Sequence, residues 1–144
     1  MKILEANGTE ITNLDGAEFN NLVLGRKNGV VSGVLNGLQI VAATQNSVAI
    51  SSGLLIVQGF RIKFEEEISI PVTPVSPDRI YYLIGSLLVK SDKSVSFTVS
   101  MRTTSNLTQN ALFQSESGTY EVKLAEVVVG TNGIQKITKT ITNL

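Results

Sequence analysis

Apolar and polar residues alternate along much of the chain, which is the pattern of β-strands with one buried face. The alternation is clearest at residues 94–102, where four apolar side chains share one parity: Val95, Phe97, Val99 and Met101. Residues 60–70 repeat the pattern, except that Glu66 falls among the apolar positions. A buried carboxylate without a partner is destabilising, so we expect a bulge, an edge or a turn at Glu66.

Short clusters of turn-forming residues separate these stretches. The apolar run at residues 80–84 is typical of a central strand that is covered on both faces. Pro71, Pro74 and Pro77 mark a loop, because proline has no backbone N–H to donate within a sheet. Five dipeptides are predicted to be hairpin connections: Gln45-Asn46, Ser52-Gly53, Gln58-Gly59, Asp92-Lys93 and Asn132-Gly133.

Closely spaced strands joined by short turns predict a mainly β chain, folded as an antiparallel β-sandwich or a barrel-like domain. The length of 144 residues suits one domain with its own hydrophobic core. We expect this β-sandwich domain to span residues 28–144 and to follow an N-terminal arm at residues 1–27.

The arm is predicted to contain a short helix at residues 17–24. Asp15 is a suitable N-cap, Phe19 and Leu22 follow at helical spacing, and Gly25 would end the helix. Because an amphipathic arm of this kind would dock onto a neighbouring chain, Phe19 and Leu22 are candidate interface residues.

The charge of the chain bears on its partners. Only 17% of the residues are charged, and 12 basic residues balance 12 acidic ones. A lightly charged surface suits a chain whose surface is covered by partner chains, so we expect a homo-oligomer. Neutrality gives no attraction to nucleic acid, and no stretch approaches the about 20 apolar residues of a membrane helix. We therefore expect neither nucleic-acid binding nor membrane insertion. The N-terminus has no long apolar segment of a secretory signal, so synthesis in a cytoplasm is expected.

The residue types exclude several chemistries. The chain has no Cys, His or Trp, which rules out Ser-His-Asp and Cys-His catalysis and thiolate metal sites. Glu65, Glu66 and Glu67 form the only acidic run. On a strand Glu65 and Glu67 would share a side, as the two carboxylates of a glycosidase do, but like charges there are more typical of a solvated edge. We expect no enzyme, no metal and no cofactor.

A glycan-binding module stays open as an alternative function. Such modules stack sugars on exposed aromatic rings, and Tyr81 or Tyr82 is the aromatic residue best placed to face outward. Tyr81 and Tyr82 are therefore candidate ligand-binding residues.

The motifs follow one another in a definite order. The first motifs are a Gly-Val-Val-Ser-Gly turn (29–33), a Ser-Ser-Gly corner (51–53) and a strand ending in Gln-Gly-Phe (58–60). A strand ending in Pro (68–71) and an Arg-hydrophobic strand (79–83) follow. The last motifs are a Leu-Ala-Glu-Val-Val-Val strand (124–129) and Ile-Thr (137–138). This order resembles that of β-rich adaptor-type domains in the tail-fibre and baseplate proteins of bacteriophages and prophages.

The resemblance implies a structural role. It implies a virion protein of the tail or baseplate, made in the cytoplasm of the bacterial host, which acts as an adaptor or a host-attachment scaffold. Its partners would be other tail or baseplate proteins and further copies of itself, with a trimer favoured, and a host surface glycan is a further candidate. No catalytic or ligand-binding residue is carried over, because the shared pattern is structural.

Overall fold

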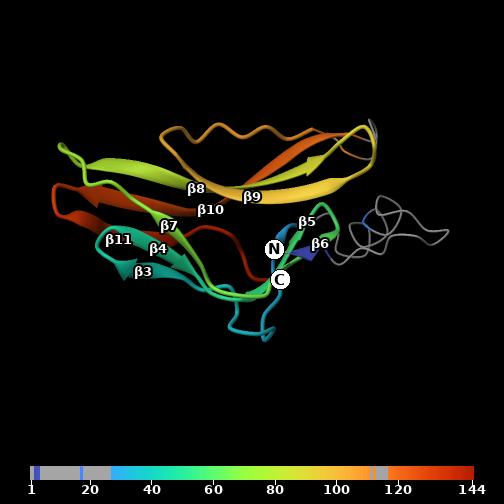
Figure 1. The fold of residues 1–144 in the computed structure, drawn as a ribbon, viewed down its shortest axis with the longest axis horizontal. Coiled ribbons are helices and arrows are strands. Elements are labelled where there is room, and N and C mark those ends of the chain that lie inside the picture. The colour runs from blue at the N-terminus through green and yellow to red at the C-terminus, as the bar shows by residue number, and fades with distance from the viewer. Residues whose placement is uncertain (1, 4–16, 18–26, 111, 113–116) are drawn as a thin grey trace.

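The computed structural model describes residues 2–3, 17, 27–110, 112 and 117–144 (Figure 1). The secondary-structure elements within these residues are all strands: β1 (Lys2–Ile3), β2 (Gly29–Val30), β3 (Ile40–Thr44), β4 (Ser47–Ile50), β5 (Gly53–Val57), β6 (Phe60–Phe64), β7 (Ile68–Pro71), β8 (Arg79–Val89), β9 (Val95–Arg102), β10 (Gly118–Gly130) and β11 (Gly133–Lys139). A mainly β fold is therefore confirmed.

The strands form three open sheets in which neighbouring strands are antiparallel. The long sheet has the order β11-β10-β8-β9, and the two shorter sheets have the orders β1-β6-β5-β2 and β3-β4-β7. Figure 1 shows the long sheet on one side of the molecule and the shorter sheets on the other. The hydrophobic core lies between them and takes residues from all three sheets.

Period-two alternation explains the long sheet. Phe97 on β9 is buried, and the three other apolar residues of that strand pack against the core, as predicted from their parity: Val95, Val99 and Met101. Strand β8 is central, as predicted, but it is covered on both faces only from Leu83 onward. Ile80, at its start, is 45% exposed. A register shift at Leu124 of β10 turns both Leu124 and Ala125 into the core.

The two short sheets share one long, kinked hairpin. Strands β4 and β7 pair up to Ile50 opposite Ile68, and β5 and β6 resume the pairing at Gly53 opposite Phe64. Two residues of one strand, Ser51 and Ser52, therefore lie opposite three of the other, Glu65 to Glu67. This extra residue confirms the irregularity expected at Glu66.

The kink corrects one turn prediction. Ser52-Gly53 is not a hairpin connection, because it lies inside this long strand, where the chain passes from β4 to β5. The hydroxyl of Ser51 accepts a hydrogen bond from the Gln39 N–H at 2.7 Å, and Asn36 Nδ2 donates to the Ser52 hydroxyl at 3.0 Å. The backbone groups that the kink removes from the ladder bond to the same loop: Ser51 N donates to the Gln39 carbonyl at 2.9 Å, and the Ser52 carbonyl accepts from the Asn36 and Leu38 N–H groups at 3.1 Å. The four other dipeptides lie at the β3–β4, β5–β6, β8–β9 and β10–β11 turns, as predicted.

Part of the predicted arm contacts the sheets. Strand β1 pairs with β6 through Ile3 opposite Ile62, and Ala17 is fully buried in the core. Apart from Ala17, the predicted helix at residues 17–24 lies outside the described residues. Ala17 and Leu112 have helical backbone, but the elements that the structure describes in full are strands, so the helical arm is not supported. The division at residue 27 stays a prediction.

Gly133 is expected to be essential for the joint between the long sheet and the β3–β4 turn. It has φ +98, and a Cβ there would overlap the Gln45 carbonyl. That carbonyl lies close because it accepts a hydrogen bond from Ile134 N at 2.7 Å. Replacing Gly133 with Ala should lower the free energy of unfolding by about 3 kcal/mol, from strain plus overlap. Gly33→Ala is the control, because Gly33 has φ +78 but open space around it, and about 1 kcal/mol is expected. Equal losses in urea unfolding would contradict the overlap.

Candidate functional site

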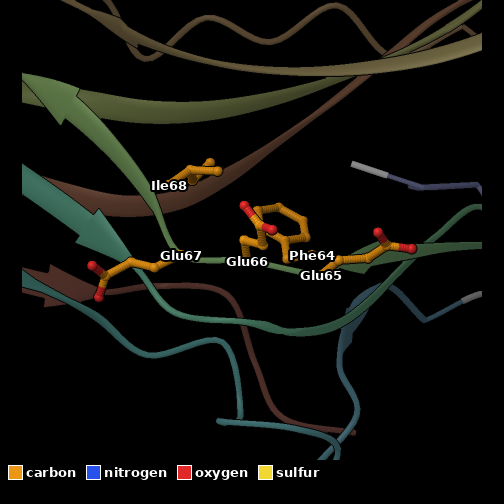
Figure 2. A pocket seen from close by; sticks show the side chains of 5 residues that line it. All are labelled: Phe64, Glu65, Glu66, Glu67 and Ile68. Carbon is orange, nitrogen blue, oxygen red and sulfur yellow. The ribbon is translucent and has the colours of Figure 1, made fainter.

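The acidic run lines a hollow at the kink of the long hairpin. A cavity of about 340 Å³ is bordered by five consecutive residues, Phe64 to Ile68. Figure 2 shows Glu65 and Glu67 extending in opposite directions, whereas Glu66 points toward the side of the long sheet. All three carboxylates are exposed. Because the strand is interrupted here, Glu65 and Glu67 do not share a side, contrary to the prediction for a continuous strand.

This arrangement does not bring two carboxylates to face one another. A glycosidase places its two carboxylates across the scissile bond, about 5–10 Å apart and convergent. Here the flanking pair diverges, so the hollow lacks that geometry. Nor does any group of three or more acidic side chains within the described part of the chain gather as a metal ion would require.

Among the residues that the structure describes, Glu121 on β10 is a buried charged residue. Its side chain is 5% exposed and forms an ion pair with the guanidinium of Arg102 on β9. The Ser86 hydroxyl of β8 donates to Glu121 Oε2 at 2.5 Å, and the Thr108 N–H donates to Oε1 at 2.8 Å. These partners come from two strands and one loop, so the carboxylate joins the outer face of the long sheet to the β9–β10 connection.

Hydrogen bonding sets the charge of this group. The bond from Arg102 is the main cause that lowers the pKa of Glu121 from 4.5 to about 2. Burial opposes this lowering, and the bonds from Ser86 and the Thr108 backbone reinforce it. The same ion pair raises the pKa of Arg102. Glu121 is therefore ionised at neutral pH, and its oxygens are occupied by partners, which fits structural anchoring rather than proton transfer.

Sequence reasoning did not identify this network. Arg102 and Glu121 each lie at a polar position of an alternating strand, and such positions usually face solvent. The available signal was their opposite charge on the polar faces of two strands of one sheet. Neither the register nor the path of the connection, whose Thr108 covers the carboxylate, follows from the sequence pattern.

Tyr81 and Tyr82 lie on opposite faces of β8. Tyr81 packs against the core, so only Tyr82 is available on the outer face. The Lys123 ammonium lies over the Tyr82 ring, 5.7 Å from its centroid, and forms an ion pair with Glu126 at 2.8 Å. Of the two candidates, Tyr82 is therefore the ring on the outer face, where it is half-buried with a cation on one side.

The candidate interface residues of the arm, Phe19 and Leu22, lie outside the described residues, so their role stays a prediction. Among the residues that the structure does describe, no helix is long and apolar enough to cross a membrane.

Comparisons with known proteins find little. No protein-family model matches the chain, and no curated protein matches it. One similar solved structure is described as the crystal structure of the gene 22 product of the Bacillus subtilis SPP1 phage. It is 21% identical, with 74% of this chain and 79% of that chain covered, at a TM-score of 0.39. The two folds are therefore only loosely alike.

Proposed function

We propose that this chain is a structural protein of a phage or prophage tail or baseplate, which acts as an adaptor or host-attachment scaffold. The proposal is carried by the ordered motifs between residues 29 and 138, because these motifs coincide with the joints of the fold. The Ser-Ser-Gly corner is the kink of the long hairpin, Gln58-Gly59 is the β5–β6 turn, and Leu124-Ala125 is the bulge of β10.

The two ends of the β domain are also locked together. Val30 of β2 donates a backbone hydrogen bond to the Thr142 carbonyl at 2.9 Å, and Leu144 donates to the Val30 carbonyl at 2.8 Å. A Cβ on Gly29 would lie 2.6 Å from that same Thr142 carbonyl, so glycine permits the close approach. Because its two ends are bonded to each other, the domain is suited to act as a rigid spacer between its partners in an assembly, without catalysing a reaction.

Absence of catalysis is part of the proposal. The exposed carboxylates at the kink diverge, and the buried carboxylate of Glu121 is neutralised by Arg102. The partners we propose are further copies of the chain and other tail or baseplate proteins, and the location is the virion tail after synthesis in the host cytoplasm. The resemblance favours a trimer, but the edges of the long sheet favour a different symmetry, which is argued below.

The alternative, a glycan-binding module, would depend on Tyr82. Its half-buried ring beside the exposed Ile80 is the aromatic surface that the outer face offers. Lys123 lies over that ring, which leaves less of it for a sugar. A glycan array on which the purified chain binds nothing would remove this alternative, whereas binding lost in a Tyr82→Ala variant would establish it.

Gene inactivation tests the structural role. In the phage or induced prophage that encodes the chain, a stop codon early in the gene should give particles with incomplete or non-adsorbing tails and at least about a 100-fold loss of infectivity, since a missing structural part blocks assembly or attachment. Expression of the wild-type chain from a plasmid should restore infectivity. Normal tails and normal adsorption without the protein would contradict the proposal.

A further inference from the structure

The edge strands of a sheet expose backbone N–H and C=O groups, with which another strand can pair. Natural proteins therefore protect their edges with charges, proline, bulges or covering loops. The long sheet has two edges, β11 and β9.

The β11 edge is protected. Ile134 N is already bonded to the Gln45 carbonyl of the β3–β4 turn at 2.7 Å. The strand also carries Lys136 and Lys139. In the short sheet, the edge strand β7 ends in Pro71, which cannot donate to a further strand.

Among the residues that the structure describes, the β9 edge has none of these protections. Strand β9 pairs with β8 in an unbroken register over eight residues, from Val89 opposite Val95 to Tyr82 opposite Arg102. It contains no proline, and it has no charged residue before Arg102, whose guanidinium is held by Glu121. Within the described part of the chain, β9 pairs only with β8, and no backbone hydrogen bond from a loop reaches it.

We propose that β9 pairs antiparallel with β9 of a second copy about a two-fold axis perpendicular to the sheet. Such an axis keeps each face of the sheet on its own side. With Thr98 opposite Thr98, the hydroxyls of Ser96 face those of Ser100 on the outer side, and Phe97 faces Val99 on the core side. Hydroxyl and apolar cross-strand pairs are favourable, and Arg102 faces the uncharged Ser94, so no like charges oppose one another.

A second copy fits this edge better than a charged partner, because the uncharged stretch from Val95 to Met101 offers such a partner no counter-charge. A ring of three copies would need β9 to pair with a different edge of the next copy. The opposite edge of the same sheet, β11, is bonded to Gln45 at its start and carries two lysines. The pairing therefore predicts a two-fold contact, alone or repeated within a larger even-numbered assembly. It does not depend on the phage assignment.

The test is the mass of the full-length chain in solution, measured by light scattering after size exclusion up to about 1 mM. The wild type should show an even multiple of the 15.4 kDa chain. Thr98 is exposed, so Thr98→Lys and Thr98→Glu should each keep the fold, which circular dichroism and thermal unfolding check. Each variant should raise the apparent Kd between copies about 100-fold, because like charges then face one another. An equimolar mixture of the two variants should regain association, because Lys then faces Glu.

Thr138→Lys is the matched control, since Thr138 is an exposed threonine on the opposite edge strand of the same sheet. Association should be unchanged in this variant. The proposal would be overturned by a wild-type chain that is monomeric or trimeric. It would also be overturned if the Thr98→Lys variant associated like the wild type, or if Thr138→Lys disrupted association equally. Because loss of the self-contact and loss of tail function are measured separately, failure here leaves the proposed function to its own experiment.

Discussion

Replacing Arg102 with methionine is expected to lower the free energy of unfolding by about 3 kcal/mol at pH 7. The variant keeps most of the apolar stem of the side chain but removes the positive charge beside Glu121. The Glu121 carboxylate, 5% exposed, then stays buried without a counter-ion. The loss should lie at the lower end of what breaking a buried ion pair costs, because Arg102 itself is 33% exposed.

The loss should depend on pH in a definite direction. In the folded wild type the pKa of Glu121 is lowered from 4.5 to about 2, chiefly by the bond from Arg102. A lowered pKa stabilises the fold fully above the ordinary value of 4.5, and that contribution is lost as pH falls toward 2. The lowering corresponds to about 3 kcal/mol. The difference in stability between wild type and variant should therefore shrink steadily between pH 5 and pH 2.

Urea unfolding at a series of pH values measures both effects. Arg79→Met is the control, because Arg79 is an exposed arginine at the start of β8, and a change within about 0.5 kcal/mol is expected. A double-mutant cycle with Glu121→Gln should give a coupling of at least about 1 kcal/mol. A pH-independent loss, or no coupling, would contradict a stabilising ion pair between Arg102 and Glu121.

Replacing Gly85 with valine is expected to destabilise the fold by a similar amount, about 3 kcal/mol. Gly85 lies opposite Val99 in the β8–β9 ladder, and a Cβ there would overlap the ring of Phe97. That ring also packs edge-on against Phe64 of β6, with centroids 6.2 Å apart. Moving Phe97 therefore disturbs the contact between the long sheet and a short one.

A second substitution distinguishes overlap from other causes. If the valine is harmful because it displaces Phe97, then Phe97→Leu should offset part of the loss, since the shorter side chain leaves room for it. In urea unfolding, the double variant should lose less free energy of unfolding than the two single variants together, by at least about 1 kcal/mol. Strictly additive losses would contradict the proposed overlap.

Much of the strand content could be predicted from local patterns. Alternation placed Phe97 inside β9, and turn chemistry located the hairpins at Gln58-Gly59 and Asn132-Gly133. The wrong-parity carboxylate at Glu66 correctly indicated an irregularity, because side-chain direction in a strand has a period of two. These features depend on neighbours in sequence, so the sequence alone contains them.

One prediction was wrong, and two features could not be predicted, where tertiary contacts decide. Ser52-Gly53 has the composition of a turn, but the hydroxyls of Ser51 and Ser52 bond to the loop at residues 36–39, and the chain makes a kink instead. Tyr81 and Tyr82 are neighbours in sequence, and only the position of the core shows which one faces outward. The ion pair of Arg102 with Glu121 depends on strand order and on a connection that crosses the sheet, neither of which a local pattern specifies.

The candidate site shows the same division. The absence of imidazole and thiol groups could be read directly from the composition. Two other features could be seen only in the assembled sheets: the acidic run diverges around a kink, and β9 is an edge strand that no other described segment covers. Both features concern how strands meet, which is also what the proposed scaffold function depends on.

The measurement that tests the central claim most directly is the copy number of this chain in purified particles, by quantitative mass spectrometry against a major tail protein. A structural part should be present at the same copy number per particle in every preparation, and it should stay after a high-salt wash that removes adsorbed proteins. A chain that is absent from the particles, or present in variable trace amounts that the wash removes, would contradict the account.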